Sequence, residues 1–254
     1  CGLCIKACRQ QVLLFGREKI AGIDRSRCVG CLKCVEACPS GALKAWGEDM
    51  SVSDVMAVIE KDRNYYERSG GGVTVSGGDP LMQSDFTREL LKACRDAGIH
   101  TCLESTFNID WKIAEDVVRY ADLIISDIKH MDSEIHRKYT GAGCEKVLEN
   151  LRRLALDGHD MILRIPLIPG INDDMQNISR TADFIEQNIG ERLKTLQLLS
   201  FMRMGEEKCM SLDRVYEMKD LEFDREEFQE KVEKIAGYFN DRGIHCVVGT
   251  KEKE

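Results

Sequence analysis

The chain has 254 residues, of which 43% are hydrophobic and 31% charged, which is typical of a globular protein with one large domain or with a small and a larger one. Its formal net charge of −8 argues against a nucleic-acid-binding protein. No apolar run approaches the roughly 20 residues of a membrane helix, and no secretory segment is evident. Twelve cysteines in such a chain indicate a reducing cytoplasm and metal ligation.

Seven of these cysteines lie within the first 38 residues. Residues 28–39 read C-x2-C-x2-C-x3-C-P, the run that binds [4Fe–4S] clusters in bacterial ferredoxins and sends its fourth Cys to the neighbouring cluster. Residues 1–8 read C-x2-C-x3-C, the same run without its first Cys. The spacing predicts a two-cluster module. One cluster is expected on Cys8, Cys28, Cys31 and Cys34, and the other on Cys1, Cys4, Cys38 and a further Cys upstream.

A disulfide framework and a zinc site are the alternatives for this stretch. Disulfide frameworks suit small secreted chains, and this chain is long. Zinc sites usually take their ligands as two pairs, whereas here four cysteines form one run. The iron–sulfur interpretation is therefore favoured over both.

The elements expected along the chain fall into two domains. In the cluster module, residues 1–49, a short hairpin is expected over residues 12–16 and 19–24. From residue 50 to 254, cysteines become sparse and strands alternate with helices, which indicates a parallel sheet or an open barrel. The expected helices span residues 51–66, 85–97, 111–120, 145–156, 174–188 and 223–239. The expected strands span residues 73–76, 99–104, 123–128, 161–165, 193–199 and 244–248.

Polar side chains follow successive predicted strands, at the end where chemistry sits in barrels of this kind. Each of them alone is typical of a solvated loop or a helix cap. Together, carboxylates, a Lys and an Arg suit a zwitterionic ligand that has both an amine and a carboxylate. In strand order these residues are Gly77, Gly78 and Asp79, then Glu104 and Ser105, then Asp127 and Lys129, then Arg164, and last Met202.

Three stretches that contain several of these residues resemble, in the same order, motifs of the activating enzymes of glycyl radical enzymes. The stretches are residues 72–83, 122–132 and 164–173. These belong to the radical S-adenosylmethionine superfamily, and the type resembled carries a two-cluster ferredoxin insert. The resemblance implies an α/β fold with two parts. A small α+β ferredoxin-like module comes first in the sequence, and a partial (β/α)6 barrel, which lacks its first strand in this chain, follows it. It also implies that a cluster reduces S-adenosylmethionine to a 5′-deoxyadenosyl radical, which removes hydrogen from a glycine of a partner glycyl radical enzyme.

The resemblance also assigns roles to site residues and partners. Gly77, Gly78 and Asp79 would receive the methionine amino group. Asp127, Ile128 and Lys129 would lie near the ribose and carboxylate. Glu104 and Ser105 would line the cavity, Arg164 would approach the carboxylate, and Met202 would lie on the adenine side. A flavodoxin- or ferredoxin-type reductant in the cytoplasm is expected, with neither nucleic acid nor membrane as a partner.

The sequence departs from the family pattern in three respects. The C-x3-C-x2-C motif that binds the site cluster, a third [4Fe–4S] cluster, is absent, so the chain is expected to be truncated at its N-terminus and inactive alone. No catalytic residue is therefore assigned within it. The family usually has Glu where Asp79 stands, and it often has His where Met202 stands.

Two other functions remain open at this stage. The chain could be an electron-transfer protein whose barrel is a degenerate remnant, which predicts reversible reduction without deoxyadenosine formation. It could also be a radical S-adenosylmethionine enzyme that takes hydrogen from a small molecule instead of a protein glycine.

Overall fold

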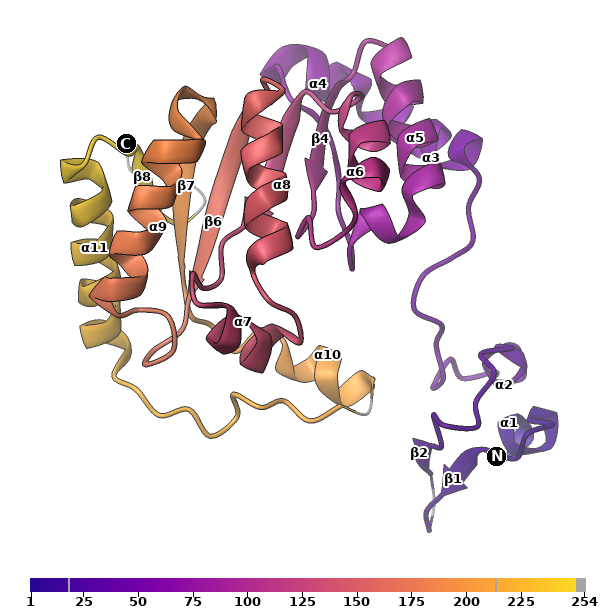
Figure 1. Ribbon diagram of the computed structural model, residues 1–254. Coiled ribbons are helices and arrows are strands. Elements are labelled where there is room, and N and C mark those ends of the chain that lie inside the picture. The colour runs from indigo at the N-terminus through magenta and orange to yellow at the C-terminus, as the bar shows by residue number, and fades with distance from the viewer. Residues whose placement is uncertain (18, 213, 250–254) are drawn as a thin grey trace. The chain divides into compact units, whose positions relative to one another are not determined.

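The computed structural model describes residues 1–17, 19–212 and 214–249 (Figure 1). It contains two compact units. The cluster unit comprises Cys1–Met50 and Arg203–Leu221, and the sheet unit comprises Ser51–Met202 and Glu222–Glu254. Residues 203–221 thus belong to the same compact unit as the N-terminal residues. The predicted boundary between two functional domains, after residue 49, stays a prediction.

The cluster unit contains the predicted antiparallel hairpin, in which Leu13 lies opposite Ile23. Two one-turn helices that the sequence analysis did not predict carry cysteines in this unit. Each begins after a residue with left-handed backbone, Gly2 for the first and Leu32 for the second. The elements are α1 (Leu3–Ala7), β1 (Leu13–Phe15), β2 (Ile20–Ile23), α2 (Lys33–Glu36) and α10 (Glu206–Ser211).

The sheet unit is built on six strands, all parallel and hydrogen-bonded in sequence order. All six strands predicted from the sequence are present, so the predicted fold class is confirmed. The short stretches rich in Val, Ile and Leu form strands because both of their faces are covered or half-covered. The strands are β3 (Gly72–Val75), β4 (His100–Glu104), β5 (Leu123–Asp127), β6 (Met161–Leu167), β7 (Leu193–Ser200) and β8 (Cys246–Val248).

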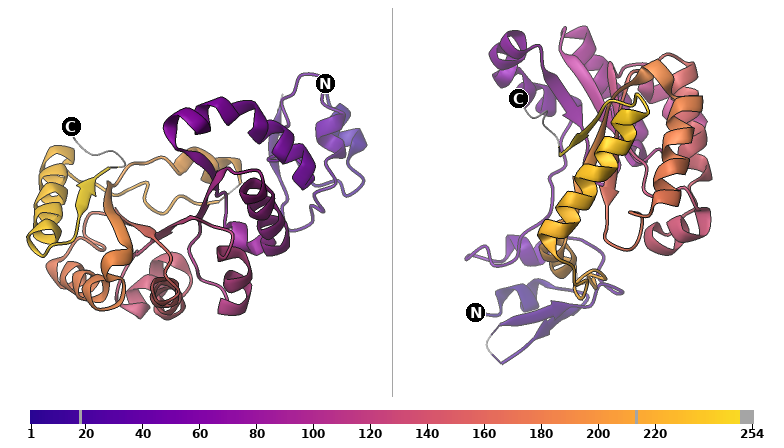
Figure 2. Two further views of the ribbon diagram at one scale, coloured as in Figure 1. Left: turned by 90° about the horizontal axis from the view of Figure 1, so that it is seen from above. Right: turned by 90° about the vertical axis from the view of Figure 1, so that its left-hand side faces the viewer.

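Helices surround the outer side of the curved sheet, as Figure 2 shows. Several begin at a side chain that caps the first turn, as with Asp132, Asp174 and Asp224. None of the helices in the described residues is both long and apolar enough to cross a membrane. The helices are α3 (Val52–Ile59), η1 (Glu60–Asp62), α4 (Arg63–Ser69), η2 (Pro80–Gln83), α5 (Ser84–Asp96), α6 (Trp111–Val118), α7 (Ser133–Thr140), α8 (Glu145–Leu156), α9 (Met175–Asn188), η3 (Gly190–Arg192) and α11 (Arg225–Asp241).

The two faces of the sheet differ in burial. Along β6, residues 161, 163, 165 and 167 are buried and join the main hydrophobic core, while the residues between them are half-buried. Because successive side chains of a strand point to opposite faces, one face packs on the helices and the other is left partly open. Asp127, Arg164 and Gln197 are aligned across β5, β6 and β7 on this open face. The open face is therefore polar near the carboxyl ends of the strands.

Candidate active site

Arg164 stands at the centre of the polar row on the open face. Its Nη1 lies 2.9 Å from Oε1 of Glu104, and its Nε donates to Oε1 of Gln197 at 3.2 Å. The side chain of Arg164 is 21% exposed and that of Glu104 is 39% exposed. The guanidinium is thus held by partners on β4 and β7, and its other N–H groups can still take an anionic ligand.

A second ion pair lies at the carboxyl end of β5. Nζ of Lys129 lies 3.0 Å from Oδ2 of Asp127. Between them, the side chain of Ile128 is buried in the core and its N–H donates to the carbonyl of Arg164 at 2.8 Å. Asp127 and Lys129 therefore share one side of the chain, and Ile128 can contribute to a ligand site through its backbone.

The glycine turn after β3 has open space beside it. Gly77 has a φ of 136°, a conformation that L side chains rarely adopt. A Cβ placed on Gly77 or on Gly78 would have no heavy atom within 4 Å. The turn thus presents backbone without side chains to an unfilled region. A ligand that binds to the main chain requires such a region.

Asp79 ties this glycine turn to the loop that follows β4. Its Oδ1 accepts from the Ser105 hydroxyl at 2.9 Å, and its Oδ2 accepts from the N–H and the hydroxyl of Thr106 at 3.0 and 2.6 Å. Ser105 is 5% exposed and its hydroxyl accepts from the N–H of Phe107 at 3.0 Å. The structure thus brings the predicted residues Asp79 and Ser105 into direct contact.

Three buried asparagines that the sequence analysis did not single out as site residues fix the loops at this edge. Nδ2 of Asn172 donates to the carbonyls of Lys129 and Pro166, both at 2.9 Å. Oδ1 of Asn177 accepts from the N–H of Met131 at 2.9 Å. The third, Asn150, fixes the loop after β4. These side chains bridge neighbouring loops, so they set where the charged residues stand.

Replacing Asn150 with Ala is expected to destabilise the sheet unit by about 3 kcal/mol, because one buried and one partly buried carbonyl would lose their donor. Nδ2 of Asn150 donates at 2.8 Å to the carbonyls of both Phe107 and Ile109. Phe107 is fully buried with a φ of 53°, so it depends on this support.

Urea unfolding followed by circular dichroism measures the effect of Asn150→Ala. Asn188→Ala is the control, since Nδ2 of Asn188 donates to the carbonyl of Phe184 within its own helix, at 3.0 Å. The control is expected to lose less than about 1 kcal/mol. Equal losses in the two variants would contradict the role given to Asn150.

Met202 lies just beyond the last residue of β7 and is 51% exposed. The structure thus places it at the same carboxyl end of the sheet as Arg164 and the glycine turn. Its contact with adenine stays a prediction.

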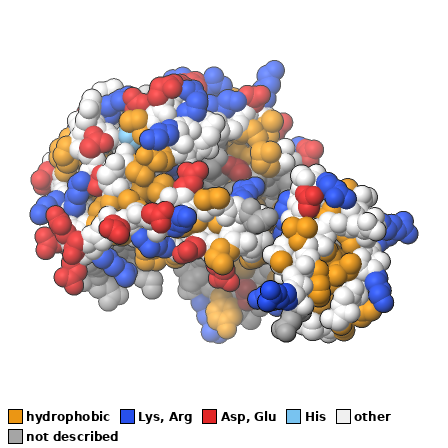
Figure 3. Space-filling model, turned by 90° about the horizontal axis from the view of Figure 1, so that it is seen from below, with side chains coloured by type: hydrophobic (Ala, Val, Ile, Leu, Met, Phe, Trp, Pro, Cys, Tyr) orange, Lys and Arg blue, Asp and Glu red, His pale blue; other side chains and the backbone are white. Residues whose placement is uncertain are grey.

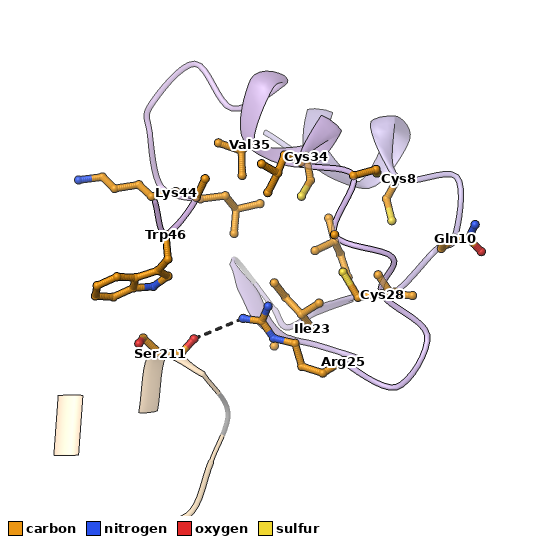
Figure 4. Close-up of a pocket in the computed structure, with 18 of the residues that line it drawn as sticks. Cys8, Gln10, Ile23, Arg25, Cys28, Cys34, Val35, Lys44, Trp46 and Ser211 are labelled. Carbon is orange, nitrogen blue, oxygen red and sulfur yellow. Dashed lines mark hydrogen bonds between the residues drawn. The ribbon is translucent and has the colours of Figure 1, made fainter. Parts of the chain in front are cut away.

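In the cluster unit, Cys8, Cys28, Cys31 and Cys34 all line one cavity of about 700 Å³. These are the four residues predicted to hold a single cluster. Figure 4 shows the sulfur atoms of Cys8, Cys28 and Cys34 on one side of this cavity, with Ile23 and Val35 around it. At the same cavity, Nη2 of Arg25 donates to the carbonyl of Ser211 at 3.3 Å.

The way the four cysteines line the cavity can be compared with the ligand arrangement of a cluster. A cubane binds one thiolate at each iron corner, so its ligands surround a volume instead of meeting at a point. Four thiols around an apolar cavity therefore fit a [4Fe–4S] cluster, although the ligation itself stays a prediction.

Backbone N–H groups already point at two of the cysteine sulfurs. The N–H of Val12 lowers the pKa of Cys8, and the N–H of Leu43 lowers the pKa of Cys38, with help from the Ser40 hydroxyl. Burial instead raises the pKa of Cys34. Donors of this kind stabilise thiolates and tune the potentials of iron–sulfur clusters.

The other three predicted ligands lie outside this cavity. Cys1 is exposed, Cys4 is buried on α1 and Cys38 is half-buried after α2. The helices α1 and α2 contact each other. Their role in a second cluster stays a prediction.

Comparison with protein families identifies both units. Residues 32–182 match the model of the radical SAM superfamily, and residues 1–42 match that of the 4Fe-4S dicluster domain. The first match covers more than half of the chain. Its residues include the glycine turn, both ion pairs and the loops that the asparagines fix.

Individual relatives agree with these matches. The chain is 55% identical over all of its length, and over 80% of the relative, to a (2S)-3-sulfopropanediol dehydratase activating enzyme of Klebsiella oxytoca. It is 36% identical over 98% of its length, and 78% of the relative, to a 4-hydroxyphenylacetate decarboxylase activating enzyme of Clostridioides difficile. The structure is similar to a solved domain of a pyruvate-formate lyase-activating enzyme from Bacteroides vulgatus, with a TM-score of 0.57 and 29% sequence identity. The match covers 71% of this chain and 99% of the solved chain.

The chain therefore belongs to the radical SAM superfamily and, within it, to the activating enzymes of glycyl radical enzymes. Its cofactors are iron–sulfur clusters and S-adenosylmethionine, and its activity is of the oxidoreductase type. The function and cofactors predicted from the sequence are confirmed at this level.

Proposed function

We propose that this protein activates a (2S)-3-sulfopropanediol dehydratase by placing a radical on one glycine of that enzyme. The observation that carries the proposal is the 55% identity to an activating enzyme of that name over the whole chain. Relatives that serve a decarboxylase and an isethionate sulfite-lyase are each 36% identical. The sulfopropanediol dehydratase is therefore the preferred partner.

We propose that S-adenosylmethionine binds at the carboxyl ends of the strands with its methionine end toward the glycine turn. The backbone of Gly77 and Gly78 offers room for the amino acid part. Arg164, oriented by Glu104, attracts the carboxylate, and Asp127 offers acceptor oxygens to the ribose hydroxyls. When bound and reduced, the cluster and S-adenosylmethionine supply the radical chemistry, while these residues set orientation.

For the cluster unit we propose a role in electron supply, from a flavodoxin- or ferredoxin-type reductant in the cytoplasm. The cluster unit, residues 1–50 and 203–221, contains 12 Lys and Arg and 10 Asp and Glu, whereas the chain as a whole has 36 and 44. Leu14, Phe15 and Trp46 are exposed, and Figure 3 shows hydrophobic side chains gathered on the cluster unit, with Lys and Arg near its margin. An apolar patch with basic neighbours suits an acidic redox protein.

The test is a comparison of partners. The product of the gene that encodes these residues is mixed anaerobically with S-adenosylmethionine, a reductant and one of three glycyl radical enzymes. These are a sulfopropanediol dehydratase, a 4-hydroxyphenylacetate decarboxylase and an isethionate sulfite-lyase. The glycyl radical signal is measured by electron paramagnetic resonance, and the dehydratase is expected to gain radical fastest.

The control for this comparison is a dehydratase variant whose radical-bearing glycine is replaced by Ala, which should give no signal. Faster activation of the decarboxylase or of the lyase would contradict the proposed partner. Such a result would not change the conclusion that the chain belongs to the family of activating enzymes.

A further inference from the structure

Gln197 is a buried amide in the polar row of the open face. It lies in β7 between Leu196 and Leu198, whose side chains are fully buried in the main core. Since successive side chains of a strand point to opposite faces, the side chain of Gln197 lies on the open face. The residue is nonetheless only 8% exposed. Burying an amide costs free energy unless it is hydrogen-bonded, so a Gln at this position needs a partner.

The partner of Gln197 is the guanidinium of Arg164. The two residues are register partners on β7 and β6, and Nε of Arg164 donates to Oε1 of Gln197 at 3.2 Å. Toward β4, Nη1 of Arg164 lies 2.9 Å from Oε1 of Glu104. The guanidinium is thus held from two sides, by the strand next to its own and by a strand two places away.

The charges of these two partners differ, and the difference matters for an anionic ligand. Glu104 is a carboxylate and offsets part of the positive charge of Arg164. Gln197 accepts a hydrogen bond without adding a second negative charge. A guanidinium has five N–H groups, and the two contacts leave some of them for a carboxylate. An amide at position 197 therefore orients the guanidinium and preserves its attraction for anions.

Holding the guanidinium in one orientation also lowers the cost of binding. An Arg side chain has many rotamers, and a ligand that must hold it in one of them loses affinity. With Nε bonded to Gln197, Arg164 is oriented before the ligand arrives. Without this bond, the guanidinium could turn two N–H groups together toward Glu104, in the paired geometry that carboxylates favour. It would then be drawn away from the ligand.

We propose that Gln197 is a positioning residue, which holds Arg164 in the orientation that receives the carboxylate of S-adenosylmethionine. Gln197 acts through Arg164 and makes no contact with the ligand itself. This inference rests on the proposed binding of S-adenosylmethionine at the carboxyl ends of the strands, with Arg164 at its carboxylate.

The variant that tests this role is Gln197→Met, which replaces the amide acceptor with an unbranched, adaptable side chain. Binding of S-adenosylmethionine and of decarboxylated S-adenosylmethionine to the full protein with its clusters is measured by equilibrium dialysis under anaerobic conditions. The variant is expected to bind S-adenosylmethionine about tenfold more weakly, the effect of losing one charge-assisted hydrogen bond. Its affinity for the decarboxylated ligand is expected to stay the same, because that ligand lacks the group that Arg164 receives.

A double-variant cycle shows whether Gln197 acts through Arg164. Arg164→Gln alone is expected to weaken binding of S-adenosylmethionine more than binding of the decarboxylated ligand. Adding Gln197→Met to it is expected to cause no further loss, because the side chain that Gln197 positions is then absent. The matched control is Gln229→Met, since Nε2 of Gln229 donates to Oε1 of Glu233 within α11, at 3.5 Å. The control should bind both ligands as the parent does.

Undiminished binding of S-adenosylmethionine by Gln197→Met would overturn the positioning role. So would equal losses for the two ligands, or losses that add in the double variant. If Arg164→Gln instead treats the two ligands alike, Arg164 does not receive the carboxylate and the proposed binding site is wrong. The two failures are thus distinguishable.

Discussion

Gly78→Ala is expected to lower the efficiency of S-adenosylmethionine cleavage on the order of 100-fold without lowering the stability of the protein. The backbone of Gly78 lies outside the left-handed region, and a Cβ there would have no heavy atom within 4 Å. The methyl group would occupy space that we assign to the methionine end, and a displacement of about 1 Å in a bound substrate can cost about this factor. Production of 5′-deoxyadenosine, measured by chromatography, reports the effect.

The matched control for this variant is Gly237→Ala, in the middle of α11. A Cβ on Gly237 also meets no heavy atom within 4 Å. Both substitutions are expected to leave the thermal midpoint unchanged or to raise it, since Ala reduces the freedom of the unfolded chain by about 0.4–1 kcal/mol. The control should keep full activity. Parental activity in Gly78→Ala would place the methionine end elsewhere.

Cys34→Ser is expected to remove one [4Fe–4S] cluster and leave the remaining clusters in place. Cys34 lines the cavity with the three other cysteines that we expect around the same cluster. A serine hydroxyl is a poor substitute for a thiolate as an iron ligand. Iron and sulfide analysis of anaerobically purified protein should show the loss of one cluster equivalent.

The control for the cluster variant is Cys209→Ser in the same unit. Cys209 is half-buried on α10 and does not line the cavity. It should retain the parental content of iron and sulfide. An unchanged iron content in Cys34→Ser, or an equal loss in Cys209→Ser, would contradict the predicted ligand set.

The order of strands could be predicted from the sequence because it depends on local patterns. Short runs rich in Val, Ile and Leu, each followed by a turn and a helix, lead to parallel strands in sequence order. Helix α7 was not predicted, since Ile135 and Tyr139 are exposed and its buried residue is His136. It has no apolar stripe for a pattern to reveal. The helix expected over residues 51–66 is divided by η1 into α3 and α4, and α4 continues to Ser69.

The sequence suggests which residues belong to the candidate site, and this remains a prediction, whereas their contacts could not be predicted from it. The sequence placed Glu104 and Arg164 at two strand ends, and their ion pair depends on the register across β5, which lies between those strands. In the same way, Asp79 reads as a free carboxylate in a glycine-rich loop. Its donors come from residues 105 and 106, and the pairing of β3 with β4 brings them near.

Buried amides were missed for a related reason. Asn172 and Asn177 stand in a segment that reads as a polar loop and a helix start, where such residues are common. Their function depends on backbone groups of another loop, at Lys129 and Met131. A long separation along the chain leaves no pattern in one sequence, so the structure was needed to find them.

The most direct test of the central claim follows one hydrogen atom. The dehydratase is produced with deuterium on its glycine α-carbons and is mixed anaerobically with the protein, a reductant and unlabelled S-adenosylmethionine. The 5′-deoxyadenosine is then analysed by mass spectrometry. An activating enzyme that takes hydrogen from a partner glycine predicts one deuterium in the product, together with a glycyl radical on the dehydratase. A product without deuterium, formed without that radical, would contradict the account.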